Sequence, residues 1–150
     1  MDVRVRVQAE PFDLEAEAAA LAVDGVGAVV TFTGLVRGQS ALGPVTAIEL
    51  EHYPAMTEKV LQSLVVEAAS RWPVQGVRLI HRIGYLPAGA PIVLVAVASA
   101  HREAAFQAAS FLMDFLKTRA PFWKKEWVNG EAHWVEAKTS DAAAADRWMP

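Results

Sequence analysis

The distribution of hydrophobic and polar residues along the 150-residue chain predicts strands and helices in a mixed order. Residues 3–7 alternate valine with arginine, which is the period-two pattern of a strand with one buried face. Asp13 is a suitable N-cap for a helix over residues 14–22. A β-branched run at residues 28–33 and an alternating stretch at residues 45–53 predict the next two strands.

The second half of the chain contains the longer elements. Apolar residues recur at positions i, i+3 and i+4 between residues 55 and 71, which predicts a helix that Pro73 ends. Residues 77–86 resemble a single strand. The unbroken aliphatic run 92–98 predicts a central strand that is covered on both faces. Residues 100–118 form the strongest helical pattern in the sequence.

The C-terminal part predicts a hairpin and a last helix. Asn129-Gly130 is a favoured hairpin turn, and residues 141–148 are compatible with a short helix. Strands and helices do not alternate strictly, so the pattern favours an α+β fold over a doubly wound parallel sheet. Because no linker divides the chain, we expect one domain over residues 1–150, with 138–150 as a C-terminal tail or short helix.

Residues 34–44 form the segment richest in turn residues. Three glycines and one proline interrupt two apolar runs there, which predicts a long, mobile loop between strands. Functional loops are often of this kind, but a plain hairpin connection has the same composition.

Composition narrows the classes of function. The absence of cysteine excludes thiol nucleophiles, thiolate metal sites and disulfides. A net charge of −3 argues against broad electrostatic binding to nucleic acid. The histidines lack paired metal-ligand spacing, so we expect no metal and no cofactor, and we expect His52 and His81 to be half-buried strand residues. The first strand is charged and the apolar run 91–98 is too short to cross a bilayer, which predicts a soluble, cytoplasmic protein without a membrane partner.

A basic segment over residues 117–126 is the first candidate site. It carries four basic residues interleaved with aromatic ones inside an acidic protein. Pro121 takes the chain out of the helix, so Lys124 can fold back toward Lys117 and form a cationic pocket, partly buried, that attracts phosphate or carboxylate. Two simpler interpretations remain open: an exposed basic patch without a ligand, and Lys117 as a favourable cation in the last helical turn.

The helix over residues 100–118 has a second informative feature. At about 100° per residue, one stripe contains Arg102, Phe106, Met113 and Lys117. Arg102 and Lys117 lie roughly 22 Å apart along the axis, so no single small ligand reaches both from one chain. Either the two ends serve different ligands or a second subunit brings them together. Alternatively, Phe106 and Met113 are simply core residues.

Two further groups are candidates for binding an anion. Arg37 lies in the glycine-rich segment, where a fork-shaped donor suits an anion clamp, although a solvated loop arginine is the simpler interpretation. His101-Arg102 lies at a helix N-terminus, where backbone N–H groups favour an anion, although capping and local ion pairing are equally compatible.

Several of these segments occur together, and in the same order, in one known family. The chain resembles the catalytic (large) subunits of molybdopterin synthase in five blocks, of which the last is highly specific: residues 27–37, 50–56, 81–84, 99–102 and 116–126. The resemblance implies an α+β fold of the hammerhead type, in which a mixed, mostly antiparallel sheet packs with two to three helices. It also implies a homodimer that binds one small ubiquitin-like sulfur-carrier subunit at each end, giving a heterotetramer.

The resemblance also implies an activity and a set of site residues. The family is a sulfurtransferase that moves two sulfurs from the thiocarboxylate on the carrier's C-terminal Gly-Gly to cyclic pyranopterin monophosphate, forming the dithiolene of molybdopterin. Lys117 and Lys124 match the two catalytic lysines. The positions expected to bind substrate are Arg37, His101, Arg102, Phe32, Met113 and Lys138. Lys138 stands where some relatives are expected to have arginine, and lysine lacks the bidentate geometry.

A rival interpretation is a non-catalytic module whose basic pocket holds a phosphorylated metabolite or an acidic partner tail. Nucleic-acid binding is a more distant alternative, against which the overall acidity argues.

Overall fold

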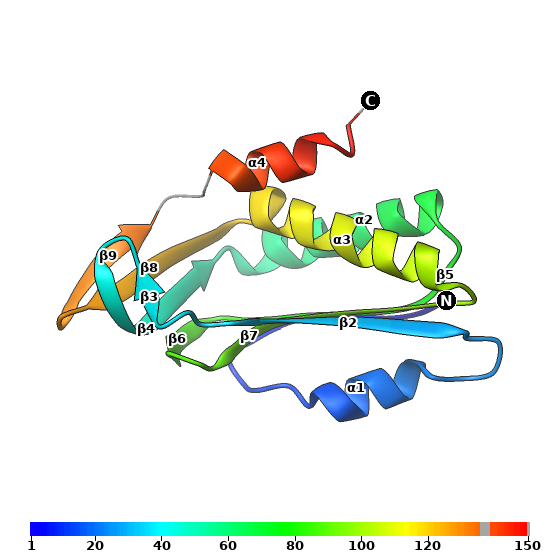
Figure 1. The fold of residues 1–150 in the computed structure, drawn as a ribbon, viewed down its shortest axis with the longest axis horizontal. Coiled ribbons are helices and arrows are strands. Elements are labelled where there is room, and N and C mark those ends of the chain that lie inside the picture. Colours follow the sequence, from blue (N-terminus) through cyan, green and yellow to red (C-terminus); the bar gives the residue numbers. More distant parts are fainter. Residues whose placement is uncertain (136–138, 150) are drawn as a thin grey trace.

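The computed structural model describes residues 1–135 and 139–149. Within them the chain forms two sheets and their helices (Figure 1). The elements in order are β1 (Asp2–Gln8), α1 (Leu14–Leu21), β2 (Ala28–Leu35), β3 (Gln39–Ser40), β4 (Gly43–His52), α2 (Pro54–Arg71), β5 (Val74–Arg82), β6 (Gly84–Pro87), β7 (Pro91–Ser99), α3 (Arg102–Arg119), β8 (Phe122–Val128), β9 (Glu131–Val135) and α4 (Thr139–Asp146).

The first sheet has the strand order β1-β5-β7-β2. β1 and β5 are parallel, and the other two pairs are antiparallel. Every residue of β7 from Val93 to Ser99 is buried, which confirms the predicted central strand covered on both faces. Helices α2 and α3 cover one face and α1 covers the other, while α4 lies against α3 (Figure 1). Three helices therefore pack on this sheet, as the resemblance implied.

The main core lies between this sheet and helices α2 and α3. Phe111 of α3 is fully buried and packs edge-on against Trp72 and Phe115 at centroid distances of 5.4 and 4.8 Å. Leu61 of α2 and Val95 of β7 belong to the same cluster. The helical periodicity predicted from the sequence therefore corresponds to the buried faces of both helices.

A smaller cluster holds α1 on the opposite face. Leu21 packs with Ile80 and Leu94 of the sheet. The Asp13 carboxylate accepts a hydrogen bond of 3.1 Å from the backbone N–H of Ala16, which confirms the predicted N-cap.

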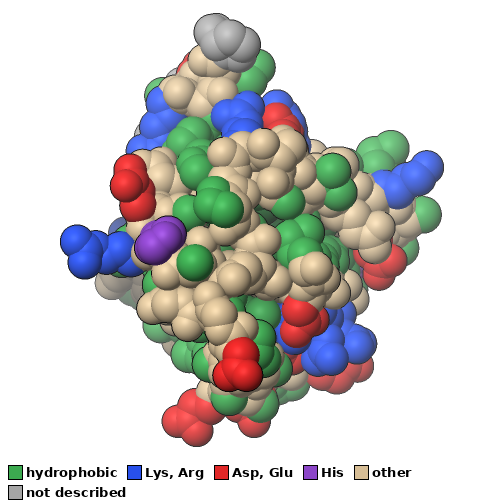
Figure 2. All heavy atoms as spheres, turned by 90° about the vertical axis from the view of Figure 1, so that its right-hand side faces the viewer, with side chains coloured by type: hydrophobic (Ala, Val, Ile, Leu, Met, Phe, Trp, Pro, Cys, Tyr) green, Lys and Arg blue, Asp and Glu red, His purple; other side chains and the backbone are tan. Residues whose placement is uncertain are grey.

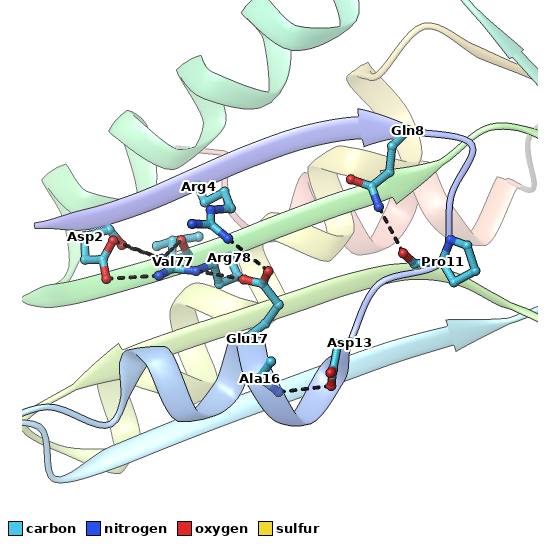
Figure 3. A network of polar contacts seen from close by, with 9 residues as sticks. All are labelled: Asp2, Arg4, Gln8, Pro11, Asp13, Ala16, Glu17, Val77 and Arg78. Atoms are coloured by element: carbon cyan, nitrogen blue, oxygen red, sulfur yellow. Dashed lines mark hydrogen bonds and ion pairs between the residues drawn. The ribbon is translucent and has the colours of Figure 1, made fainter.

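A buried arginine ties α1 and β1 to β5. The Arg78 side chain is only 3% exposed and forms ion pairs of 3.0 Å with Glu17 of α1 and Asp2 of β1 (Figure 3). Its hydrogen bond to Asp2 holds the pKa of that carboxyl below the ordinary value.

The predicted core face of β1 is confirmed in part. Val5 and Val7 pack against the main core, whereas Val3 is 41% exposed, because β1 is an edge strand.

The second sheet has the order β3-β4-β8-β9, and β6 also pairs with β4. Asn129 and Gly130 have positive φ angles of 52° and 77°, which confirms the predicted hairpin turn between β8 and β9. Its own small core includes Ile48, Leu86 and Val128.

Two sequence predictions near this sheet were wrong in detail. Residues 77–86 form two strands, because the chain turns at Gly84, whose φ is +85°, and β6 leaves β5 to pair with β4. Residues 34–44 are not one long loop: β2 continues to Leu35, and β3 and β4 form a short hairpin, which the composition also allowed. Its turn is at residues 41–42, next to Gly43, whose φ is +124°. The glycines in these segments predicted that the chain turns there, but not at which residues it turns.

Among the residues described, no helix is both long and apolar enough to cross a membrane.

Candidate functional site

The turn between α3 and β8 joins the two sheets and carries the predicted lysines. Lys117 lies in the last turn of α3, which ends at Arg119. Ala120 is extended, with φ −71° and ψ 132°, and Pro121 cannot continue a helix. β8 begins at Phe122. The predicted exit from the helix is confirmed.

The register of β8 decides where Lys124 points. In the ladder with β4, Phe122 lies opposite His52 and Lys124 lies opposite Leu50. Because side chains alternate along a strand, Phe122 and Lys124 share one face and Trp123 lies on the other. Lys124 therefore lies on the side of β8 that Phe122 occupies.

Phe122 packs against two histidines from different strands. The His81 ring of β5 stacks on Phe122 with centroids 3.9 Å apart and planes 19° apart. The His52 ring lies 6.1 Å from the same centroid. Nδ1 of His81 is 2.7 Å from the carbonyl oxygen of Arg82. This aromatic group links the end of the first sheet to the start of β8.

Burial is the largest cause that lowers the pKa of His81, and the nearby charges of Lys117 and His52 lower it as well; the resulting value is about 4. The hydrogen bond to the Arg82 carbonyl opposes this shift. His81 is therefore neutral at pH 7. Since a carbonyl only accepts, Nδ1 carries the proton and Nε2 has a free lone pair. Lys117 lies in the last turn of α3, which ends three residues before Phe122 of this stack.

Lys117 and Lys124 therefore lie on either side of the turn at Pro121, and Lys124 shares a face of β8 with the stacked Phe122. Lys124 is half-buried, but Lys117 is exposed, so the expected burial of Lys117 is not found in the single chain. Two surface cavities lie elsewhere, one between β1 and α2 and the other between α3 and residues 147–148, which follow α4. A single chain leaves Lys117 accessible to a partner.

The other end of α3 carries His101 and Arg102, both exposed. His101 occupies the N-cap position of α3, as the capping interpretation expects, but its side chain makes no capping hydrogen bond. Phe106 is 61% exposed, whereas Met113 is half-buried against the main core, so only Met113 fits the core interpretation. Figure 2 shows this end of the molecule, where basic and acidic side chains are mixed around apolar ones and neither charge forms a continuous patch.

Three expected substrate-binding residues remain. Arg37 is exposed just after β2, and the preceding Val36 is pinned by backbone hydrogen bonds of 2.9 Å to Ala90 and 2.8 Å from Gly89. Phe32 is 42% exposed on β2 and lies opposite Val95, hence on the face of the sheet that α3 covers. The third residue, Lys138, lies outside the described residues.

The position of His81 in this site was not predicted from the sequence. The strand pattern predicted a half-buried residue, but the side chain is buried and stacked on Phe122. His52 is half-buried, as expected. No local pattern indicates a ring stack between strands so distant in sequence. The only signal was that His81 falls in one of the blocks that carry the resemblance.

Comparison with known proteins decides the family. The model of the MoaE protein family matches residues 7–119. The chain belongs to the MoaE family. It is 54% identical over 148 residues to the molybdopterin synthase catalytic subunit of Cereibacter sphaeroides, covering 97% of this chain and 100% of that protein. It is 52% identical over 148 residues to the Escherichia coli K12 subunit of the same name, with 98% and 99% coverage.

Solved structures of MoaE-family proteins have the same fold. The MoaE protein of Burkholderia ambifaria superposes with a TM-score of 0.83 at 46% identity, covering 99% of this chain and 98% of that one. A chain of molybdopterin synthase from Staphylococcus aureus superposes with a TM-score of 0.82 at 33% identity, covering 87% and 95%. The resemblance and the α+β fold expected from it are therefore confirmed.

Proposed function

We propose that this MoaE-family chain is the catalytic subunit of a molybdopterin synthase, acting in the cytoplasm as a sulfurtransferase. It transfers two sulfurs from the C-terminal thiocarboxylate of a small ubiquitin-like carrier to cyclic pyranopterin monophosphate. The relatives that match it over their full length carry this name. The observation that supports the proposal is that Lys117 and Lys124 flank the turn at Pro121, where Phe122 stacks on His81 and the charge of Lys117 lowers the pKa of that ring.

Lys117 is the residue that meets the carrier. Its exposed ammonium is accessible to an incoming C-terminal tail, and it stabilises the thiocarboxylate and the negative charge that develops as sulfur leaves. Lys124, half-buried on the Phe122 face of β8, holds the pterin intermediate or assists proton transfer to it. Neither role requires a metal or a cofactor.

A second copy of the chain completes the substrate site. His101 and Arg102 lie at the opposite end of an 18-residue helix from Lys117, too far for one small ligand in one chain. In a homodimer, His101 and Arg102 of one copy reach the lysines of the other and bind the phosphate and pterin. Arg37 and Lys138 add positive charge, and Phe32 and Met113 line the pocket. One carrier at each end then makes the heterotetramer.

Separate substitutions of Lys117→Ala and Lys124→Ala test the proposal, using thiocarboxylated carrier and pterin precursor with product measured by mass spectrometry. Each variant should lose about 10²–10³-fold in turnover, the usual effect of removing one group that stabilises developing charge. Lys59→Ala is the matched control, because Lys59 is an exposed lysine on α2.

Near-normal product from both folded lysine variants would overturn these roles. A wild-type chain that binds the precursor but returns it unchanged in the presence of sulfur donor would instead be a non-catalytic binding module.

A further inference from the structure

Lys117 and Arg119 both lie in the last turn of α3, but their side-chain contacts differ. Arg119 forms an ion pair of 3.2 Å with Glu67 and lies 4.0 Å above the Phe115 ring. Among residues 1–135 and 139–149, Lys117 forms no ion pair and no hydrogen bond. An ammonium on a flexible stem with three donors needs an oriented acceptor to hold one direction. Without one, ordering it for catalysis costs side-chain entropy.

His81 offers such an acceptor, because its ring stacks on Phe122, which follows the end of the Lys117 helix by three residues. Its Nδ1–H is fixed on the Arg82 carbonyl at 2.7 Å, and its ring is held flat against Phe122. Within the described part of the chain, Nε2 has no hydrogen-bond donor. His52 has the same tautomer, with the proton on Nδ1. The Thr57 hydroxyl donates to the Tyr53 carbonyl at 2.7 Å, so Nδ1 of His52 donates to Thr57 Oγ1 at 3.2 Å.

We propose that His81 is a positioning residue for Lys117, whose ammonium donates a hydrogen bond to Nε2 of His81 when the carrier tail covers the site. The bond leaves the other two N–H groups of Lys117 aimed at the thiocarboxylate. A neutral acceptor suits this task better than a carboxylate, because it orients the ammonium without cancelling the charge that the reaction uses. This inference rests on the proposed function of Lys117.

Three substitutions of His81 separate this role from packing. His81→Phe keeps a flat ring on Phe122 and removes both nitrogens. His81→Asn keeps a donor for the Arg82 carbonyl but lacks the acceptor. His81→Gln places an amide oxygen near the position of Nε2. With thiocarboxylated carrier, kcat should fall about tenfold in the Phe and Asn variants, equivalent to one hydrogen bond, with KM for the carrier nearly unchanged. The Gln variant should recover most of kcat.

Full activity of a folded His81→Phe variant would overturn the inference. Equal losses in the folded Gln and Phe variants would overturn it as well, since a purely structural role predicts no rescue by glutamine.

A second measurement does not depend on turnover. Long-range ¹H–¹⁵N spectra of histidine-labelled protein report the protonation of each ring nitrogen, with and without carrier that ends in an ordinary carboxylate. We expect a protonated Nδ1 and a bare Nε2 in His81, and an Nε2 resonance that moves on carrier binding in the wild type but not in Lys117→Met. Lys59→Met should behave like the wild type.

The outcomes are distinguishable. If carrier changes no resonance of the chain, the proposed function fails and this inference fails with it. If carrier binds but Nε2 responds alike in the wild type and in Lys117→Met, only the role of His81 is wrong.

Discussion

The two sheets of the molecule use their side chains in opposite ways. In the first sheet, the central strand β7 is buried from Val93 to Ser99 and packed on both faces. In the second sheet, large aromatic side chains lie at the surface: Trp134 and Tyr85 are each 60% exposed, and Trp123 is 42% exposed. The first sheet is stabilised by burial on both faces, whereas the second has a smaller core and leaves large aromatic side chains exposed.

The candidate site lies where these two regions meet. His81 belongs to β5 of the buried sheet and Phe122 to β8 of the open one. A rigid, buried ring therefore supports a strand whose lysine is only half-buried. The residues proposed to bind ligand are thus positioned by the core without belonging to it. Substitutions in the two regions should consequently affect different measurements.

The largest effect on stability should come from the core. Phe111→Ala removes a fully buried ring that packs against Trp72, Phe115 and Trp148, and we expect a loss of about 3–5 kcal/mol in the free energy of unfolding. Urea titration measures it. Phe106→Ala is the matched control, because Phe106 lies on the same helix and is 61% exposed. A similar loss in both variants would show that burial does not separate these two residues.

The next effect concerns acid stability at the junction. The pKa of His81 is about 4 in the folded chain and 6.5 in the unfolded reference. Between these values the unfolded chain binds a proton that the folded chain does not, so this contribution is complete above pH 6.5 and is lost as the pH falls toward 4. The loss amounts to about 3 kcal/mol at 1.36 kcal/mol per unit.

His81→Gln has no ring to titrate, so it should lose about 3 kcal/mol less than the wild type between pH 7 and pH 4. Urea unfolding at both pH values measures the difference, in which the titration of the carboxylates cancels. Equal acid losses in the two proteins would mean that the His81 ring is not held neutral by burial.

Local sequence patterns were sufficient for the elements whose structure is decided locally. The aliphatic run of β7, the period of α3, the Asp13 cap and the Asn129-Gly130 turn each follow from neighbouring residues. The break between β5 and β6 did not, because residues 77–86 are strand-like throughout and the division depends on β6 pairing with β4. A strand-like sequence fits either one long strand or two shorter ones, and the pairing with a distant strand decides between them.

The same reasoning explains how far the site could be predicted. Pro121 ends the helix through its own backbone chemistry, which is a local property. The sequence therefore predicted that the chain turns back after Lys117 and carries Lys124 toward it. The stack of Phe122 on His81 joins strands of different sheets, and its geometry depends on the register of the whole β4–β8 ladder. The exposure of Lys117 was missed because composition does not show which side of a helix end remains uncovered.

The smallest effect on the free energy of unfolding should come from a substitution in the second, open sheet. Trp134 is as large as any core residue but is 60% exposed, and its described interaction is with the Lys125 ammonium, 4.6 Å from the ring centroid. Trp134→Leu should therefore cost only about 0.5–1 kcal/mol, the value of an exposed cation–π contact. Urea unfolding beside Phe111→Ala measures the contrast. A cost as large as that of Phe111→Ala would mean that Trp134 is buried in solution, and that a second molecule already covers this sheet.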